Sequence, residues 1–286
     1  MSSVVQQLRA LFVLGRISNF PTVWSNCLAA WLLNGGGGWV HFYRLCAGAS
    51  LLYAGGMFLN DAFDAAFDRQ HRAERPIPSG QITACAVGIW GALFLLLGWL
   101  ILLPLGTLAA LAAFLLLAAI VIYDAIHKYL ALAPLLMAGC RFLLYFLAAS
   151  ATRNRVCAPV IWNGLALATY VAGVSFLARG ESTRAIIGRW PLALLFAPIV
   201  ASVARNSNRD FVSWIATACL FAWVCSCLHK SLSSTGKAVG QSVAGLLAGI
   251  VLVDWSATSY QPNGFSVVFV GLFVFAWILQ RTIPAT

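Results

Sequence analysis

The chain has 286 residues, of which 61% are hydrophobic and only 9% are charged. Soluble domains carry about 25% charged residues, so this composition excludes a water-soluble globule and also a disordered chain. The formal net charge is +10. In a membrane protein such an excess sets orientation and attracts anionic headgroups or phosphorylated substrates, and no aromatic–basic interleaving indicates nucleic-acid binding.

Ten apolar segments follow one another along the chain, most of them close to the ~20 residues that a helix needs to cross a bilayer. They are 18–34, 43–61, 82–103, 106–127, 132–151, 159–178, 190–204, 210–229, 238–255 and 264–281. The seventh is short, so nine or ten transmembrane helices are expected. The sequence therefore predicts an all-α, polytopic membrane bundle, with residues 1–286 as a single integral membrane domain.

Three polar stretches follow the second, fourth and sixth segments, so they lie on one side of the membrane. That side carries twelve of the Lys and Arg residues, namely Arg9, Arg16, Arg69, Arg72, Arg75, Lys128, Arg179, Arg184, Arg189, Lys230, Lys237 and Arg281. The other side carries five: Arg44, Arg153, Arg155, Arg205 and Arg209. Because positive loops stay inside, the polar stretches and the polar groups gathered there are predicted to face the cytoplasm and to line one wet cavity.

The second segment ends in a run of acids that begins Asn60-Asp61 and continues with Asp64 and Asp68. At ~100° per residue, the three carboxylates fall on one helix face in consecutive turns. Three like charges this close repel one another unless a cation lies between them, and hard oxygen ligands of this kind suit Mg²⁺. The alternative is a solvated helix end whose acids pair with the arginines that follow.

Those arginines lie in the polar stretch 69–80, which includes Arg72, Arg75 and a Pro-Ile-Pro-Ser-Gly turn. Arginine fits phosphate oxygens bidentately, so metal-bound carboxylates beside several arginines predict a cradle for a diphosphate. The plainer alternative is a positive-inside loop followed by a turn.

The fourth segment ends in Tyr123-Asp124-Ala-Ile-His127-Lys128. Asp124 and Lys128 are i, i+4 neighbours, as are Tyr123 and His127. We interpret Lys128 as a phosphate-binding residue oriented by Asp124, with Tyr123 beside the substrate. The alternative is a snorkelling lysine in a helix-end ion pair.

Arg141 lies about ten residues into the fifth segment. A lone arginine at that depth is expected to face the cavity. Its partner is left open: a diphosphate, a substrate carboxylate, or Asp124 in a purely structural pair.

The acidic run, read as Asn-Asp-x-x-Asp-x-x-x-Asp and followed by Arg-Pro-Ile-Pro-Ser-Gly, resembles the first aspartate-rich motif of the UbiA superfamily of intramembrane prenyltransferases. The opening stretch 16–26 looks like the first helix of that family, and the Tyr-Asp…His-Lys and Cys-Arg patterns are similar to its Ebo-operon branch. Many UbiA-like proteins have Tyr-x-x-x-Lys after the fourth span. Here His127 holds that place and Lys128 comes one residue later.

The resemblance implies nine helices around a central cavity and Mg²⁺-dependent transfer of an isoprenyl chain from its diphosphate to an acceptor. It implies a metal role for Asp61, Asp64 and Asp68. It further implies that Asn60 and Asn26 make polar contacts to the diphosphate. The acceptor, the prenyl chain length and the oligomeric state are not encoded in any motif.

The chain departs from that family after the sixth segment, where a second aspartate motif is expected. Residues 172–184 contain one acid, Glu181, flanked by Arg179 and Arg184. We predict that one of these arginines supplies the positive charge of a weakened second Mg²⁺, with Glu181 orienting it or holding a loose metal.

Three alternatives remain at this point. The missing motif favours a degenerate, non-catalytic protein of the same fold that binds prenyl lipid or assists assembly. A CDP-alcohol phosphotransferase also uses intramembrane aspartates, but its longer acidic pattern is absent. A transporter would show paired broken helices or a repeat, and neither is visible.

Overall fold

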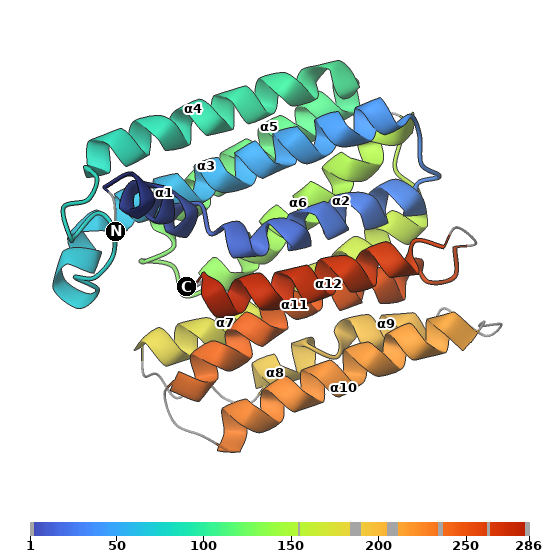
Figure 1. The fold of residues 1–286 in the computed structure, drawn as a ribbon. Coiled ribbons are helices and arrows are strands. Elements are labelled where there is room, and N and C mark those ends of the chain that lie inside the picture. Colours follow the sequence, from blue (N-terminus) through green and yellow to red (C-terminus); the bar gives the residue numbers. More distant parts are fainter. Residues whose placement is uncertain are drawn as a thin grey trace.

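The computed structural model describes residues 3–153, 155–183, 190–204, 211–233, 237–261 and 264–283. Within these ranges the chain is helical and has no strand. The helices are α1 (Ser3–Leu14), α2 (Phe20–Leu33), α3 (Trp39–His71), α4 (Ala84–Leu102), α5 (Thr107–Ile126), α6 (Ala133–Arg153), α7 (Ala158–Thr183), α8 (Trp190–Leu194), α9 (Ala197–Ala204), α10 (Phe211–Ser233), α11 (Lys237–Thr258) and α12 (Ser266–Thr282). Most lie side by side in one bundle (Figure 1).

Six of the described helical stretches are long and apolar enough to cross a bilayer: 84–105, 107–126, 133–153, 158–179, 211–231 and 240–258. The stretches 190–204 and 266–282 are apolar but shorter, and the first is broken into α8 and α9. The prediction of a multi-pass, all-helical membrane protein is confirmed. The count of nine or ten crossings stays a prediction.

The outer faces of the bundle suit lipid. Leu97 and Leu100 on α4, Phe114 on α5 and Phe221 on α10 are all exposed. The main apolar core takes residues from α2 to α12. Large apolar side chains thus cover both the inside and the outside of the bundle, as a membrane environment requires.

The backbones of α3 and α4 approach each other closely at glycines. A Cβ added to Gly55 would lie 2.8 Å from the carbonyl oxygen of Gly91, and one added to Gly98 would lie 2.9 Å from that of Gly48. Only glycine permits such contacts. The two points of backbone contact lie seven residues apart on each helix and therefore fix α3 against α4.

Helix α3 is longer than the apolar pattern predicts. The expected span ends at residue 61, but the helix continues to His71. Asp61, Asp64 and Asp68 therefore lie on one uninterrupted helix, as their spacing predicted.

Candidate active site

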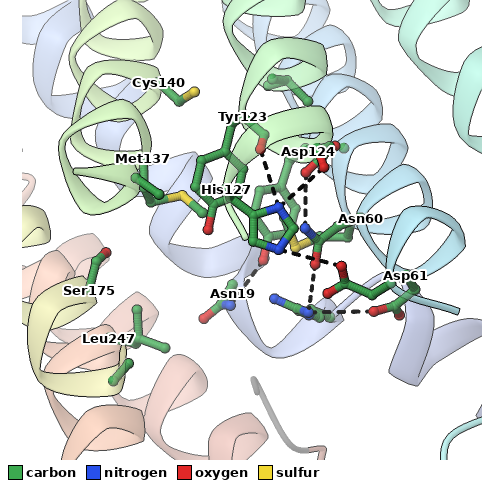
Figure 2. Close-up of a pocket in the computed structure, with 18 of the residues that line it drawn as sticks. Asn19, Asn60, Asp61, Tyr123, Asp124, His127, Met137, Cys140, Ser175 and Leu247 are labelled. Atoms are coloured by element: carbon green, nitrogen blue, oxygen red, sulfur yellow. Dashed lines mark hydrogen bonds and ion pairs between the residues drawn. The ribbon is translucent and has the colours of Figure 1, made fainter. Parts of the chain in front are cut away.

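A cavity of about 1310 Å³ opens among α1, α3, α5, α6, α7 and α11. Most polar lining residues come from α3 and from the end of α5, and α6 adds Arg141. The opposite wall is largely apolar and contains Val171 and Val174 of α7 with Val243, Leu247 and Ile250 of α11. Figure 2 shows Leu247 and Ser175 on the side opposite Asn60 and Asp61.

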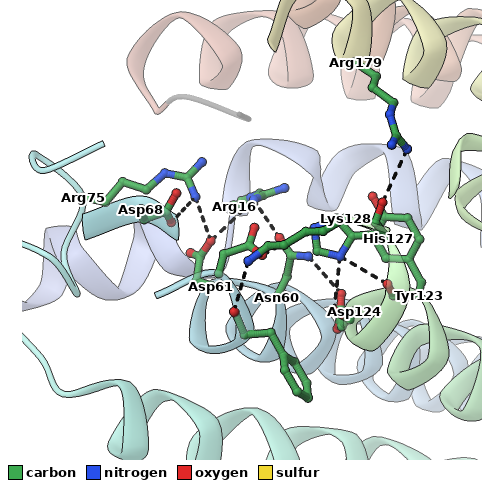
Figure 3. Close-up of polar contacts among 12 residues, drawn as sticks. Arg16, Asn60, Asp61, Asp68, Arg75, Tyr123, Asp124, His127, Lys128 and Arg179 are labelled. Atoms are coloured by element: carbon green, nitrogen blue, oxygen red, sulfur yellow. Dashed lines mark hydrogen bonds and ion pairs between the residues drawn. The ribbon is translucent and has the colours of Figure 1, made fainter. Parts of the chain in front are cut away.

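Two of the three motif carboxylates share one arginine. Arg75 Nη1 lies 2.8 Å from Asp68 Oδ2 and 3.3 Å from Asp61 Oδ1. Arg16 Nη2 lies 3.5 Å from the same Asp61 oxygen (Figure 3). Asp68 is only 2% exposed, and its Oδ1 is buried without a hydrogen-bond partner in the described part of the chain. Arg75 is thus brought to the predicted cradle, and Asp68 keeps one carboxylate oxygen for another ligand.

The third carboxylate, Asp64, is held from α5. Lys128 Nζ lies 2.7 Å and His127 Nε2 lies 3.4 Å from Asp64 Oδ1. Lys128 also donates to the carbonyl oxygen of Phe63, at 3.2 Å. The predicted pairing of Lys128 with Asp124 is wrong, because the lysine reaches across to α3 instead of following its own helix.

His127 joins the site from the end of α5. Its ring stacks on Tyr123, with ring centroids 5.1 Å apart, and its Nδ1 lies 3.2 Å from the carbonyl oxygens of Tyr123 and Asp124. Burial lowers the pKa of the His127 imidazole, but its hydrogen bond to Asp64, the charges of Asp64 and Asp124 and the contact with the Asp124 carbonyl together leave that pKa above its ordinary value. The acids around His127 therefore favour its protonated form.

Asn60 connects the two sides of the site. Its Nδ2 donates to Asp124 Oδ1 at 3.1 Å, and its Oδ1 accepts from Arg16 Nη2 at 3.3 Å. Asp124 is 3% exposed, and its Oδ2 is buried without a partner among the described residues. Asn60, Asp124 and Tyr123 all line the cavity, and their role in substrate binding stays a prediction.

Arg72 and Arg179 also line the cavity. Arg72 is half-buried and makes no ion pair in the described ranges. Arg179 Nη1 donates to the carbonyl oxygen of Leu130 at 2.6 Å and contacts that of His127 at 3.4 Å. The side chain of Glu181 and the whole of Arg184 lie outside the described part of the chain.

Arg141 and Asn26 are in direct contact inside the bundle. Arg141 lines the cavity, and its Nη1 donates to Asn26 Oδ1 at 2.8 Å. Asn26 is fully buried and does not line the cavity, so direct contact with a diphosphate is excluded in this arrangement. The suggested Arg141–Asp124 pair is also absent among the ion pairs of the described residues.

Arg16, Asn19 and Tyr53 were not predicted as site residues, yet all three line the cavity. Arg16 has φ 42° and ψ 51°, a left-handed conformation that is unusual for a residue with a side chain. Such strain often accompanies functional sites. The sequence feature that could have pointed to Arg16 as a site residue is its position just before the first apolar segment.

The carboxylates offer the oxygen donors that Mg²⁺ prefers. As they stand, no three His, Cys, Asp or Glu side chains in the described residues converge on one point that could hold a metal ion. In this arrangement the carboxylates instead pair with Arg16, Arg75 and Lys128. Asp68 lines the cavity, and its buried Oδ1 has no hydrogen-bond partner among the described residues, so this oxygen is left for a metal ligand role.

Comparison with known proteins gives matches at the levels of sequence and fold. The profile of the UbiA prenyltransferase family matches residues 18–181. A digeranylgeranylglyceryl phosphate synthase of Methanoregula boonei is 34% identical over 91 residues, which are 32% of this chain and 33% of that protein. The match thus spans about a third of that curated relative.

Solved structures share the fold at low sequence identity. A UbiA homologue from Aeropyrum pernix K1 is 18% identical, with a TM-score of 0.68 over 84% of this chain and 96% of that chain. A UbiA homologue from Archaeoglobus fulgidus, solved with DMAPP and Mg²⁺, is 13% identical, with a TM-score of 0.52 over 96% of this chain and 100% of that chain. At these identities the similarity establishes the fold.

Proposed function

The chain belongs to the UbiA prenyltransferase family, and from this we propose that it transfers an isoprenyl chain from a prenyl diphosphate to an acceptor within the membrane. The observation that carries the proposal is the cluster of carboxylates and cations at one end of a cavity whose opposite wall is apolar. The Archaeoglobus homologue binds DMAPP and Mg²⁺, which supports the same donor class here.

Mg²⁺ is the metal that we assign to Asp61, Asp64 and Asp68. The metal, when bound, would neutralise charge on the diphosphate. The free Oδ1 of Asp68 supports this assignment. Arg75 and Lys128, which now pair with the carboxylates, would turn to phosphate oxygens.

The residues of the chain act on the leaving group by electrostatics. As the bond between the allylic carbon and the diphosphate oxygen breaks, negative charge grows on the diphosphate and is stabilised by Arg72, Arg75 and Lys128. The acceptor then bonds to the allylic carbon and loses a proton. The apolar wall of α7 and α11 holds the chain and keeps water from the carbocation.

Either Arg179 or Arg184 is proposed to supply the positive charge that a second acidic motif would bring with its metal. Arg179 supports this by lining the cavity beside His127. An arginine is always protonated, so it needs no metal occupancy. Glu181 would orient an arginine or hold a loose metal.

A second candidate function is the binding of prenyl lipid without turnover. The single acid in 172–184 favours it, because a site with one weak metal position stabilises the leaving group less. In this candidate function the cavity still binds the prenyl lipid, but no prenyl chain is transferred.

Orientation also stays a proposal. The twelve-to-five excess of Lys and Arg supports a cytoplasmic position for the carboxylate end of the bundle. The partners are then a prenyl diphosphate, an unidentified acceptor and the bilayer.

The test is release of diphosphate from geranyl diphosphate and Mg²⁺ by the purified protein, with lipid extract of the source cells as the supply of acceptor. Asp64→Asn keeps the shape of the side chain and removes its charge. We expect turnover to fall by about 10²-fold, while the matched change Asp210→Asn, which the predicted topology puts on the other side of the membrane, stays near wild type. Turnover by Asp64→Asn at the wild-type rate would refute the metal assignment. Binding of geranyl diphosphate by the wild-type protein without any release would favour the non-catalytic candidate.

A further inference from the structure

We propose that Arg141 binds an anionic group of the acceptor, either a carboxylate or a phosphate monoester. This inference rests on the proposed transfer reaction, because it names the chemical class of acceptor that the cavity takes. It follows from how Arg141 is held, from which wall it occupies, and from its depth relative to the acidic cluster.

Arg141 is a buried cation with no carboxylate at hydrogen-bonding distance among the residues that the structure describes. It is 9% exposed and belongs to the cavity wall. Its Nη1 donates to Asn26 Oδ1 at 2.8 Å and its Nη2 donates to Thr22 Oγ1 at 3.1 Å, and both acceptors are neutral. A guanidinium has five N–H donors, so it keeps donors for a ligand in the cavity.

The carboxylate of Asp254 lies on the far side of Asn26 from Arg141. Asp254 is fully buried, and its Oδ2 accepts from Ser25 Oγ at 2.6 Å and from Asn26 Nδ2 at 2.7 Å. Asn26 therefore stands between the carboxylate and Arg141, with its amide nitrogen toward one and its oxygen toward the other. Asp254 therefore orients Arg141 through Asn26 and makes no direct ion pair with it among the described residues.

Polar groups beside Arg141 on the cavity wall suit a polar acceptor: Asn19 and Tyr53 both line the cavity. Asn19 Nδ2 donates to Tyr53 Oη at 2.9 Å, and the Arg141 guanidinium lies 5.8 Å from the centroid of the Tyr53 ring. Gln280 Nε2 of α12 in turn donates to Asn19 Oδ1 at 2.6 Å. Because the opposite wall of α7 and α11 is apolar, the prenyl chain belongs there and the acceptor belongs beside Arg141.

Depth separates Arg141 from the diphosphate site. Tyr53, which contacts the guanidinium, precedes Asp61 by eight residues on α3, a rise of ~12 Å. Two phosphates joined by one oxygen are too short to bridge that gap. An anion at Arg141 is therefore a second anion, and the acceptor carries its nucleophile well apart from this anionic group.

Two pairs of soluble probes test the proposal on the purified full-length protein: 4-hydroxybenzoate against phenol, and glycerol 1-phosphate against glycerol. Calorimetry in detergent compares wild type with Arg141→Gln and with the matched control Arg44→Gln, an exposed position outside the cavity. We expect one anion to bind wild type better than its neutral partner, and Arg141→Gln to weaken it by about 10- to 100-fold. Which anion binds distinguishes a carboxylate acceptor from a phosphate acceptor.

Binding of geranyl diphosphate with Mg²⁺ should be the same in Arg141→Gln and wild type, because it depends on the carboxylates of α3. Loss of that binding in wild type would defeat the proposed function, whereas equal binding of both members of each probe pair would defeat only the role of Arg141. Equal anion binding by wild type and Arg141→Gln would also overturn it.

If Arg141→Gln does not fold, a second readout needs only the native arginine. Cys140 lies next to it and lines the cavity. In a protein whose other seven cysteines are replaced by alanine, the anionic probe should slow alkylation of Cys140 more than its neutral partner. Equal protection by the two would overturn the proposal.

Discussion

Gly55→Ala should loosen α3 from α4 and displace the acidic cluster. The new Cβ would lie 2.8 Å from both the carbonyl oxygen of Gly91 and the backbone nitrogen of Leu95. Ordinary contact begins at 3.4 Å, so the two backbones must separate locally by about 0.6 Å. Both contacts are with backbone, so no side chain can rotate away to relieve them.

The cost follows from that displacement. Overpacking in a close-packed interior destabilises by about 1–3 kcal/mol. Asp61 follows Gly55 by six residues on the same helix, a rise of ~9 Å, so part of the shift reaches the carboxylates. A misplacement of about 1 Å in a reacting site can lower the rate by 10²-fold, and we expect a smaller loss, of about tenfold, here.

The assay is equilibrium unfolding in detergent, followed by transfer with geranyl diphosphate. Gly271→Ala is the matched control, since no atom lies within 4 Å of its added Cβ. On α12 it should be neutral or gain up to ~1 kcal/mol of helix propensity. If Gly55→Ala unfolds at the same denaturant concentration as Gly271→Ala, the close contact of α3 and α4 is not rigid and the reasoning fails.

Three further predictions concern charge. Lys128→Met should raise the KM for prenyl diphosphate at least tenfold, yet change the free energy of unfolding by less than ~1 kcal/mol, as for partly exposed ion pairs; unfolding and steady-state kinetics check both. A cysteine at Ser79 in a cysteine-free background should react with an impermeant thiol reagent only in opened membranes, and labelling of intact cells would reverse the proposed topology. In transfer assays across Mg²⁺ concentrations, Arg179→Ala or Arg184→Ala should lose activity that extra Mg²⁺ does not restore. Rescue of Glu181→Ala by Mg²⁺, with both arginine variants like wild type, would make Glu181 a metal ligand instead.

The fold class and the acidic helix face could be predicted because both depend on local periodicity. Composition alone indicates membrane helices, and a spacing of three and then four residues puts Asp61, Asp64 and Asp68 on one face wherever that helix lies. The end of α3 was harder to predict. Hydropathy ends at residue 61, while the helix continues to His71 because its polar end packs against the cations of other segments.

Partner choice could not be predicted from spacing. Asp124 and Lys128 are i, i+4 neighbours at the end of α5. Lys128 nevertheless pairs with Asp64, at 2.7 Å, and Asp124 accepts a hydrogen bond from Asn60. A pair on one helix gains only about 0.2–0.5 kcal/mol. A tertiary contact with a crowded carboxylate face gains more, and nothing in a local pattern reports that the two helices meet.

The ion pairs also explain how three carboxylates stay together on one helix face before a metal arrives. Arg16 and Arg75 contact Asp61, Arg75 reaches Asp68, and Lys128 contacts Asp64, so three cations offset three negative charges. Arg72 adds a further positive charge without an ion pair in the described part of the chain. Over the whole described lining of the cavity, seven Arg and Lys residues face five Asp and Glu residues. The lining is therefore positive by about two charges when Mg²⁺ is absent, and this excess attracts a diphosphate that keeps negative charge after Mg²⁺ binds it. A second acidic motif would cancel that excess, so its absence is consistent with a site that relies on arginine and lysine for much of its hold on the diphosphate.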